Sequence, residues 1–125
     1  NVNSQYGEVT FNSGTTGDIY MTCPIAPFDT GSACGYKLEI TGVEEAGSAS
    51  AWLDYSQAAS AGTAYNITDV YAGAYDDTYS SSIFYTSPDF VNNYYWVNIL
   101  LTRANSLEAS PAVYAVKLVA LQSGC

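Results

Sequence analysis

Apolar and polar residues alternate along most of this chain, in short runs separated by residues that favour turns. Alternation with a period of two places successive side chains on opposite faces and is typical of β-strands. In the clearest run, residues 35–41, an aromatic or aliphatic side chain occupies every second position. The pattern predicts strands at residues 5–11, 18–23, 35–41, 48–55, 64–71, 80–86, 93–103 and 111–121.

Two alanine-rich stretches are compatible with either a strand or a helix. Residues 48–55 alternate small and polar side chains before Trp52, and we interpret them as a strand. Residues 57–63 could form one helical turn, but Gly62 ends a run that is short for a stable helix.

The spacing of the predicted strands favours an all-β fold. About eight strands at intervals of 8–15 residues, with turn residues between them, predict a two-sheet antiparallel sandwich of the jelly-roll type. The 125 residues are enough for one hydrophobic core and too few for two. We therefore expect a single domain, residues 1–125, without internal repeats or linkers.

Residues 93–103 are predicted to form a strand that is largely apolar on both faces. Tyr95, Val97, Ile99 and Leu101 fall on one face, and the other face carries Tyr94, Trp96 and Leu100. A strand that is apolar on both faces is expected in the middle of a sheet, with cover on each side. We expect the partner sheet to cover one face, and a loop, a neighbouring subunit or a ligand to cover the other.

The charge balance excludes two classes of partner. The sequence has 12 acidic and 3 basic residues, a formal net charge of −9. Such a chain repels phosphate backbones and anionic lipid headgroups, which argues against nucleic acid and membrane surfaces. No apolar run approaches the roughly 18 to 20 residues that cross a bilayer, so membrane insertion is not expected either.

Several features predict an exported protein, either secreted or at the cell surface. The chain has three cysteines, few lysines and arginines, many tyrosines and no histidine. It starts at Asn1 rather than at an initiator methionine, which is expected after removal of a signal peptide or for a trimmed chain.

Short motifs carry a resemblance to a known group. Residues 20–25 end in Cys-Pro-Ile, residues 95–103 read Tyr-x-Val-x-Ile-x-Leu-x-Arg, and residues 113–118 form a further Val-rich strand. In these motifs the chain resembles small exported bacterial β-sandwich proteins of unassigned function. The resemblance covers about half of the chain and implies fold and export, but no activity. A partner cysteine that this group would place near residues 50–55 is missing here.

The cysteines allow several pairings. Cys23 and Cys34 bracket a loop between two predicted strands, and a bridge there would stabilise the fold by roughly 3 kcal/mol. We expect the Cys23–Cys34 bridge, with Cys125 free or in an intermolecular bond. Cys23–Cys125 and Cys34–Cys125 stay open as alternatives. A zinc site is not expected, because the chain has no histidine and no Cys-x-x-Cys pair.

Few residues of this chain are candidates for catalysis. Without histidine, Ser/His/Asp and Cys/His catalysis are excluded. Neighbouring carboxylates on a strand point to opposite faces, and those on a turn are normally solvated, so we expect neither an enzyme nor a cofactor. The carboxylates considered as acid/base groups are Glu44, Glu45, Asp54, Asp69, Asp76 and Asp77.

Two further sites rest on short patterns. Asp29, Asp76 and Asp77 are weak calcium candidates, because they lie in predicted loops rich in oxygen donors but lack the spacing of an EF-hand loop. Asn66, followed by Ile67 and Thr68, fits the N-glycosylation sequon.

The aromatic content is the main functional signal. The chain has 12 tyrosines, 2 tryptophans and 4 phenylalanines, and only Lys37 and Lys117 are available to guard strand edges. Aromatic side chains can stack on sugar rings or anchor protein interfaces, because they bury an apolar ring and keep a polar tip in water. The candidate interface or ligand residues are Trp52, Tyr55, Tyr75, Tyr79, Tyr94 and Trp96.

Two functions follow as hypotheses. The leading one is a self-assembling subunit of an extracellular filament, pilus-like fibre or surface layer, in which residues 1–11 add a strand to the sheet of the next copy. The alternative is a non-catalytic carbohydrate-binding module or adhesin that uses Trp52, Tyr55, Tyr75 or Tyr79 as a platform for sugars.

Overall fold

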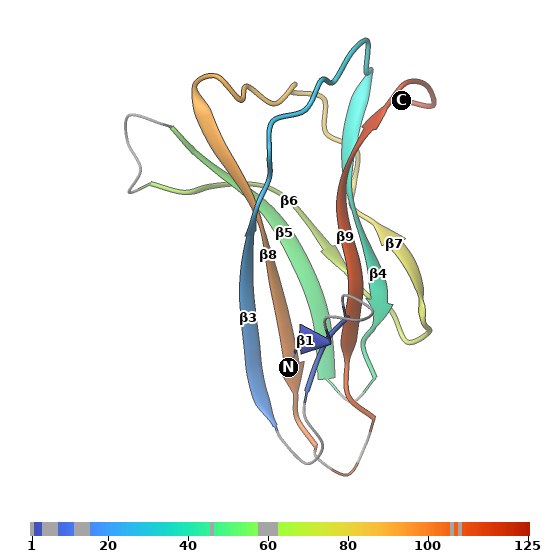
Figure 1. Ribbon diagram of the computed structural model, residues 1–125. Helices are drawn as coiled ribbons and strands as arrows, with labels where there is room; N and C mark the ends of the chain where they lie inside the picture. The colour runs from blue at the N-terminus through green and yellow to red at the C-terminus, as the bar shows by residue number, and fades with distance from the viewer. Residues whose placement is uncertain are drawn as a thin grey trace.

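The computed structural model describes residues 2–3, 8–11, 16–45, 47–57, 63–105, 107 and 109–125. In these residues the chain forms nine strands and no helix. The strands make two antiparallel sheets that pack face to face, which confirms the predicted two-sheet sandwich (Figure 1).

Sheet A has the strand order β1-β2-β9-β4-β7, and sheet B has the order β3-β8-β5-β6. The strands of sheet A are β1 (Val2–Asn3), β2 (Glu8–Thr10), β4 (Gly35–Val43), β7 (Asp77–Ser80) and β9 (Ala112–Leu121). The strands of sheet B are β3 (Gly17–Pro24), β5 (Gly47–Gln57), β6 (Tyr65–Tyr71) and β8 (Asn93–Arg103).

The connections run mostly between the sheets. Among the described strands from β2 onward, only β5 and β6 are consecutive strands of the same sheet. A jelly roll also places eight strands in two sheets. The jelly-roll topology stays a prediction.

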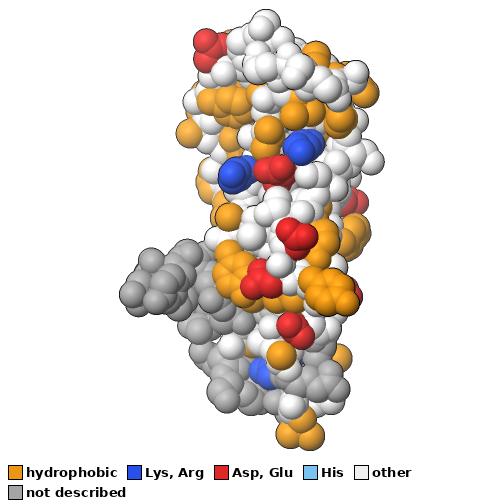
Figure 2. Space-filling view, turned by 90° about the vertical axis from the view of Figure 1, so that its right-hand side faces the viewer, with side chains coloured by type: hydrophobic (Ala, Val, Ile, Leu, Met, Phe, Trp, Pro, Cys, Tyr) orange, Lys and Arg blue, Asp and Glu red, His pale blue; other side chains and the backbone are white. Residues whose placement is uncertain are grey.

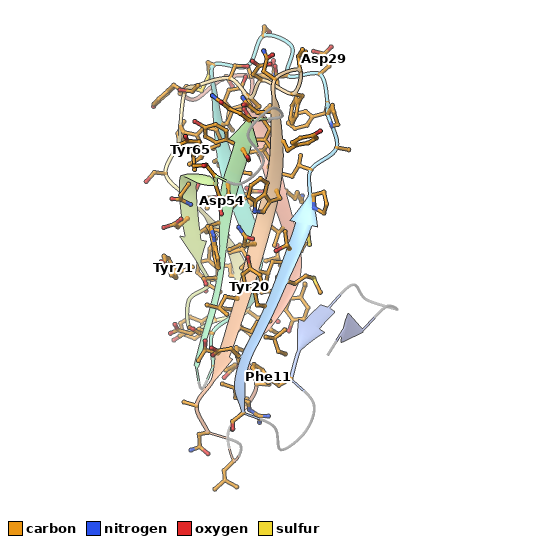
Figure 3. The ribbon with its side chains drawn as sticks, turned by 90° about the vertical axis from the view of Figure 1, so that its left-hand side faces the viewer. Phe11, Tyr20, Asp29, Asp54, Tyr65 and Tyr71 are labelled. Carbon is orange, nitrogen blue, oxygen red and sulfur yellow. A yellow bond between two sulfur atoms is a disulfide. The ribbon has the colours of Figure 1, made fainter. Side chains whose placement is uncertain are left out.

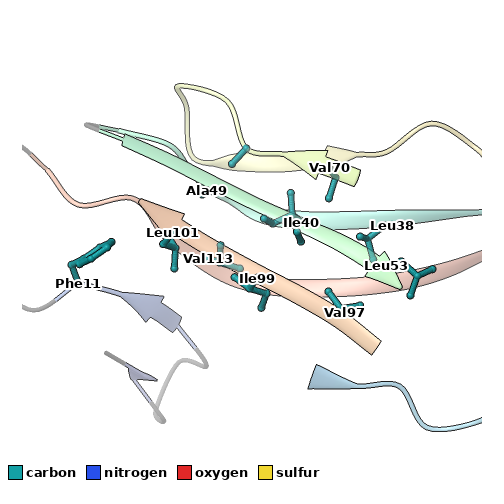
Figure 4. Packing of buried hydrophobic residues seen from close by; sticks show 12 residues of the cluster. Phe11, Leu38, Ile40, Ala49, Leu53, Val70, Val97, Ile99, Leu101 and Val113 are labelled. Carbon is teal, nitrogen blue, oxygen red and sulfur yellow. The ribbon is translucent and has the colours of Figure 1, made fainter. Parts of the chain in front are cut away.

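The core lies between the sheets. Leu38 and Ile40 of β4, Leu53 of β5 and Leu101 of β8 have no exposed surface. Figure 4 shows these side chains directed into the space between β4, β5 and β8, together with Val97 and Ile99. Burial of each large aliphatic side chain stabilises the fold by about 1.5 to 3 kcal/mol, so this cluster fixes how the two sheets pack.

The pairing of β4 with β9 contains an irregularity that only glycine accommodates. The register shifts between Thr41 and Gly42, where Gly42 lies opposite Val113. A Cβ atom on Gly42 would lie 2.4 Å from the carbonyl oxygen of Ala112. Beyond the shift, Val113 points into the core and is 2% exposed. The bulge thus lets Val113 on one side of it, and Val116 and Leu118 on the other, all pack against the core.

Strand β8 lies in the interior of sheet B, as its composition predicts. It pairs with β5 along its whole length on one side, and with β3 from Trp96 to Arg103 on the other. Its inward side chains are buried. On its outward face Tyr94 is 61% exposed and Asn98 is 1% exposed, whereas Trp96 and Leu100 are half-buried. The second face of β8 is therefore only partly covered in this molecule.

The predicted strand at residues 80–86 is wrong in position. Strand β7 ends at Ser80. Beyond it the backbone N–H of Ser81 donates to the carbonyl oxygen of Leu38 at 2.8 Å, and an isolated bridge joins Tyr36 to Phe84. The hydroxyl of Ser81 accepts a hydrogen bond from the backbone N–H of Leu38 at 2.9 Å. Serine side chains that bond to the backbone compete with the regular ladder of a sheet, which explains the early end.

Other strand predictions are confirmed, or lie partly outside the described residues. Residues 48–55 lie in β5 and 64–71 contain β6, as predicted. The first predicted strand, 5–11, contains β2, but residues 4–7 lie outside the described part of the chain. Most of the ambiguous stretch 57–63 also lies outside it.

The expected bridge between Cys23 and Cys34 is wrong, and the alternative Cys34–Cys125 is the one that forms. Cys34 precedes β4, whose first residue, Gly35, pairs with Leu121 at the end of β9. The Cα atoms of Cys34 and Cys125 are therefore only 6.0 Å apart, although 91 positions separate them in the sequence. Cys23 lies on β3 in the other sheet and is free. A disulfide fits an oxidising compartment.

Candidate functional site

The outward side chains of sheet B form a surface that we call the aromatic face. It carries Tyr20 and Thr22 from β3, Tyr94, Trp96, Asn98 and Leu100 from β8, Trp52 and Asp54 from β5, and Asn66, Asp69 and Tyr71 from β6. Figure 3 views this face and shows Tyr20, Asp54 and Tyr71 on it.

The registers of the strands set the pattern of this face. Asn98 lies between Thr22 of β3 and Trp52 of β5, and Trp52 lies beside Asp69 of β6. One residue pair further along, Trp96 lies beside Asp54, which pairs with Asn66. Aromatic rings and polar side chains are therefore neighbours across the strands of this face.

The polar side chains form one connected network. Tyr20 Oη donates to Asn98 Oδ1 at 2.6 Å, and Asn98 Nδ2 donates to Asp54 Oδ2 at 2.9 Å. Asn66 Nδ2 donates to Asp54 Oδ1 at 3.1 Å and to Asp69 Oδ1 at 3.0 Å. Because Asn98 is 1% exposed, the centre of this network is withdrawn from solvent and held in one geometry.

A hollow of about 530 Å³ lies over β5 and β6 on the aromatic face. Trp52 and Tyr71 line it together with Asp54, Asn66 and Asp69. Within the described residues, Asn66 Oδ1 and Asp69 Oδ2 accept no hydrogen bond from the protein. The hollow thus combines aromatic surface with free hydrogen-bond acceptors.

The structure gathers only some of the predicted aromatic residues on this face. Trp52, Tyr94 and Trp96 point outward from β5 and β8. Tyr55 is not with them, because its ring stacks between Tyr65 and Tyr95, at centroid distances of 5.3 and 5.6 Å.

Tyr75 and Tyr79 lie elsewhere. The Tyr79 hydroxyl donates to the carbonyl oxygen of Tyr75 at 2.6 Å, and its ring packs against Gly73. The Tyr75 side chain is 82% exposed. Neither residue lines the hollow: Tyr79 lies on β7 of sheet A, and Tyr75 lies in the segment between β6 and β7.

Sequence reasoning missed Tyr20, Asn98 and Tyr71. All three stand at outward positions of strands that the pattern did predict. The alternation alone could have placed them on a solvent-facing side, but it does not tell which strands are neighbours in a sheet.

The weak calcium candidates make local contacts. Asp29 Oδ1 accepts the backbone N–H of Gly31 at 2.8 Å, and Asp77 Oδ1 accepts that of Thr78 at 2.8 Å. Asp76 is exposed beside Asp77. The described residues contain no group of three or more His, Cys, Asp or Glu that could hold a metal ion. Of the proposed acid/base carboxylates, Asp54 and Asp69 are linked through Asn66.

The predicted glycosylation residue is part of the network on the aromatic face. Asn66 is exposed, but its Nδ2 atom, to which a glycan would be attached, donates to both Asp54 and Asp69. A glycan at this atom would disrupt those hydrogen bonds, and its presence stays a prediction.

A second candidate lies at the open side of the sandwich, between β3 and β9. An apolar groove of about 380 Å³ runs there, which we call the β3–β9 groove. Its lining includes Met21 and Ile25 from the side of β3, Ile99 from β8, and Val116 and Leu118 from β9. The free Cys23 also lines it.

Strand β9 is unpaired along most of this groove. On the side away from β4 it pairs with β2, but only at Ala112 and Val113. Within the described residues no strand pairs with residues 115–121 on that side, and β3 is likewise an edge strand of sheet B. Two strand edges with free backbone groups therefore border one apolar groove.

The outer face of sheet A differs from both sites. Lys37 and Glu39 form an ion pair at 3.2 Å, and Glu39 lies opposite Lys117 of β9. Figure 2 views the molecule from this side and shows lysine and acidic side chains lying together. The third basic residue, Arg103, is 6% exposed.

No protein-family model, curated protein or solved structure matches this chain. No helix in the described residues is long and apolar enough to cross a membrane.

Proposed function

We propose that this protein is an exported structural subunit that assembles with copies of itself by adding a strand at the open edge of β9. The observation that carries the proposal is the β3–β9 groove, because it combines unpaired backbone edges with an apolar lining. Exposed strand edges readily pair with strands from other chains, and such added strands gain affinity from main-chain hydrogen bonds.

The open edge of β9 has little protection against such pairing. Proteins commonly guard edges with charged side chains, proline or a covering loop. Between residues 115 and 121 the only charged side chain is that of Lys117, and it lies beside Glu39 of β4. Val116 and Leu118, which point into the groove, are only partly buried. An added strand would cover both the backbone edge and this apolar surface.

The N-terminal segment of a neighbouring copy is the occupant that we propose. Strand β2 already pairs in antiparallel fashion with β9, with Val9 opposite Val113. In this copy β1 folds back on β2, with Val2 opposite Val9. If the segment of a neighbouring copy continued in the same register along β9, its residues 1–7 would lie opposite residues 115–121. Exchange of such a segment between identical copies is a common route to oligomers.

Two variants test this proposal with a matched control. Val119→Glu adds a charge to the open edge while facing Lys37 across the strands, so the fold should tolerate it. Ser80→Lys adds a charge to β7, at the other edge of sheet A, facing Glu39. We expect light scattering and electron microscopy at neutral pH to show concentration-dependent oligomers or fibres for the natural protein and Ser80→Lys. We expect association at least about tenfold weaker for Val119→Glu.

The thiol of Cys23 gives an independent measurement of occupancy. Because Cys23 lines the groove, an added strand should slow its alkylation by iodoacetamide as the protein concentration rises. Removal of residues 1–7 should abolish both the assembly and this protection. A strictly monomeric protein at high concentration, or equal assembly of Val119→Glu and Ser80→Lys, would contradict the proposal.

A further inference from the structure

We propose that the aromatic face is a binding site for an uncharged oligosaccharide, centred on the hollow between Trp52 and Tyr71. This site lies on the outer face of sheet B, whereas the β3–β9 groove lies between the two sheets. The inference therefore does not depend on self-association.

The aromatic side chains supply flat surfaces of the kind that sugar rings stack on. Tyr71 is 66% exposed and borders the hollow on β6, and Trp52 borders it on β5. The ring of Tyr20 lies 6.0 Å from that of Trp52, tilted by 43°, and extends the apolar surface across β8 to β3. The C–H faces of a pyranose are apolar, so they gain from burial against such rings.

The polar side chains between the rings match the hydroxyl groups at the rim of a sugar. Asp69 Oδ2 and Asn66 Oδ1 are available as acceptors, and sugar hydroxyl groups are donors. Asp54 is held by Asn98 on one side and by Asn66 on the other. Because these groups are already fixed by one another, little conformational entropy would be lost when a ligand binds.

The charge of the aromatic face indicates which carbohydrates can bind there. The aromatic face carries Asp54 and Asp69 but no lysine or arginine, because Lys37 and Lys117 lie on the outer face of sheet A and Arg103 is buried. Sulfated or carboxylated sugars would meet only like charge there. The site therefore fits neutral glycans.

Other occupants fit this face less well. If two copies met face to face, the carboxylates of both would be brought together without a cation to pair with them. An apolar protein surface would bury the free acceptors of Asn66 and Asp69 without hydrogen bonds, which is costly. A sugar satisfies the rings and the acceptors together.

The test is an NMR titration of the ¹⁵N-labelled protein with cellohexaose, mannohexaose, hexa-N-acetylchitohexaose and heparin. We expect at least one neutral hexasaccharide to shift amide signals of β5, β6 and β8, and heparin to shift none. The Val119→Glu variant serves as a second host, so that failure of self-association and failure of sugar binding are measured separately. Absence of shifts with all three neutral sugars, or binding of heparin alone, would overturn the inference.

Substitution of two exposed tyrosines locates the site. Tyr71→Ala removes a ring from the hollow, and Tyr75→Ala removes another exposed ring that lies outside it. We expect at least about tenfold weaker binding for Tyr71→Ala and unchanged binding for Tyr75→Ala, with thermal unfolding of both close to that of the natural protein. Equal affinities of the two variants would contradict the assignment.

Discussion

The two sheets of this sandwich present outer faces of different chemistry. On sheet A the charged side chains lie near one another and pair, as Lys37 does with Glu39 at the surface. On sheet B the carboxylate of Asp54 has amide partners, and one of them, Asn98, is 1% exposed. Ion pairs at a surface contribute little stability, whereas a connected network withdrawn from water fixes side chains in place. The difference distinguishes a face whose charged side chains are solvated from one whose polar side chains hold one another in place, as the proposed sugar site requires.

The sheets are also fastened differently at the end of the molecule that holds the C-terminus (Figure 1). A disulfide ties Cys34, before β4, to Cys125, after β9, in sheet A. The loop that leads into β8 of sheet B relies on hydrogen bonds instead, in which Asp89 accepts from the backbone of Val91 and Asn92. The next three experiments separate the contributions of covalent, buried and exposed contacts.

The largest effect is expected from removal of the disulfide. The bridge closes a loop with a sequence separation of 91, and its loss through Cys34→Ser with Cys125→Ser should lower the free energy of unfolding by about 3 to 5 kcal/mol. Urea denaturation measures this change. Cys23→Ser is the control, because it removes a thiol that forms no bridge. A double variant no less stable than Cys23→Ser would contradict the importance of this bond.

An intermediate effect is expected at the centre of the aromatic face. Asn98→Ala removes the partner of Tyr20, Thr22 and Asp54, and should cost about 2 to 3 kcal/mol in unfolding free energy, because three part-buried hydrogen bonds, one of them to a carboxylate, are lost together. Thr41→Ala is the matched change on sheet A, where Thr41 shares one exposed hydrogen bond with Thr78. It should cost less than about 1 kcal/mol. Urea denaturation measures both changes, and similar losses of unfolding free energy in Asn98→Ala and Thr41→Ala would contradict the contrast between the two faces.

The smallest effect concerns the acidity of Asp89. Hydrogen bonds from the side chain and backbone of Asn92, with a further one from the backbone of Val91, lower the pKa of Asp89 below 3.8. The ionised form favours the folded turn, so its contribution is present above the ordinary pKa of aspartate and is lost as the pH falls through the lowered value. Carboxyl NMR titration should give this low pKa, and Asn92→Ala should move it up toward 3.8. An unchanged pKa in that variant would contradict the assigned cause.

The order of polar and apolar residues was enough to predict the fold class and most strands. The period of two in residues 35–41 and 93–103 recurs in β4 and β8, because burial on one side of a sheet requires it. The prediction was wrong at residues 80–86, where serine hydroxyl groups compete for backbone partners. Of the predicted interface or ligand candidates, Trp52 and Trp96 point outward from sheet B. Tyr55 instead stacks between Tyr65 and Tyr95, and the Tyr79 hydroxyl donates to the carbonyl oxygen of Tyr75.

What the sequence alone determined is local: strand alternation, acidic charge and an abundance of aromatic side chains. Tertiary structure decided which strands are neighbours, and through this it decided which residues meet. Tyr20 and Asn98 are separated by 78 positions and share a hydrogen bond, and Cys34 pairs with Cys125 rather than with the nearer Cys23. The physical reason is that strand order is set by how two whole sheets bury their apolar faces, and no single stretch of sequence contains that information.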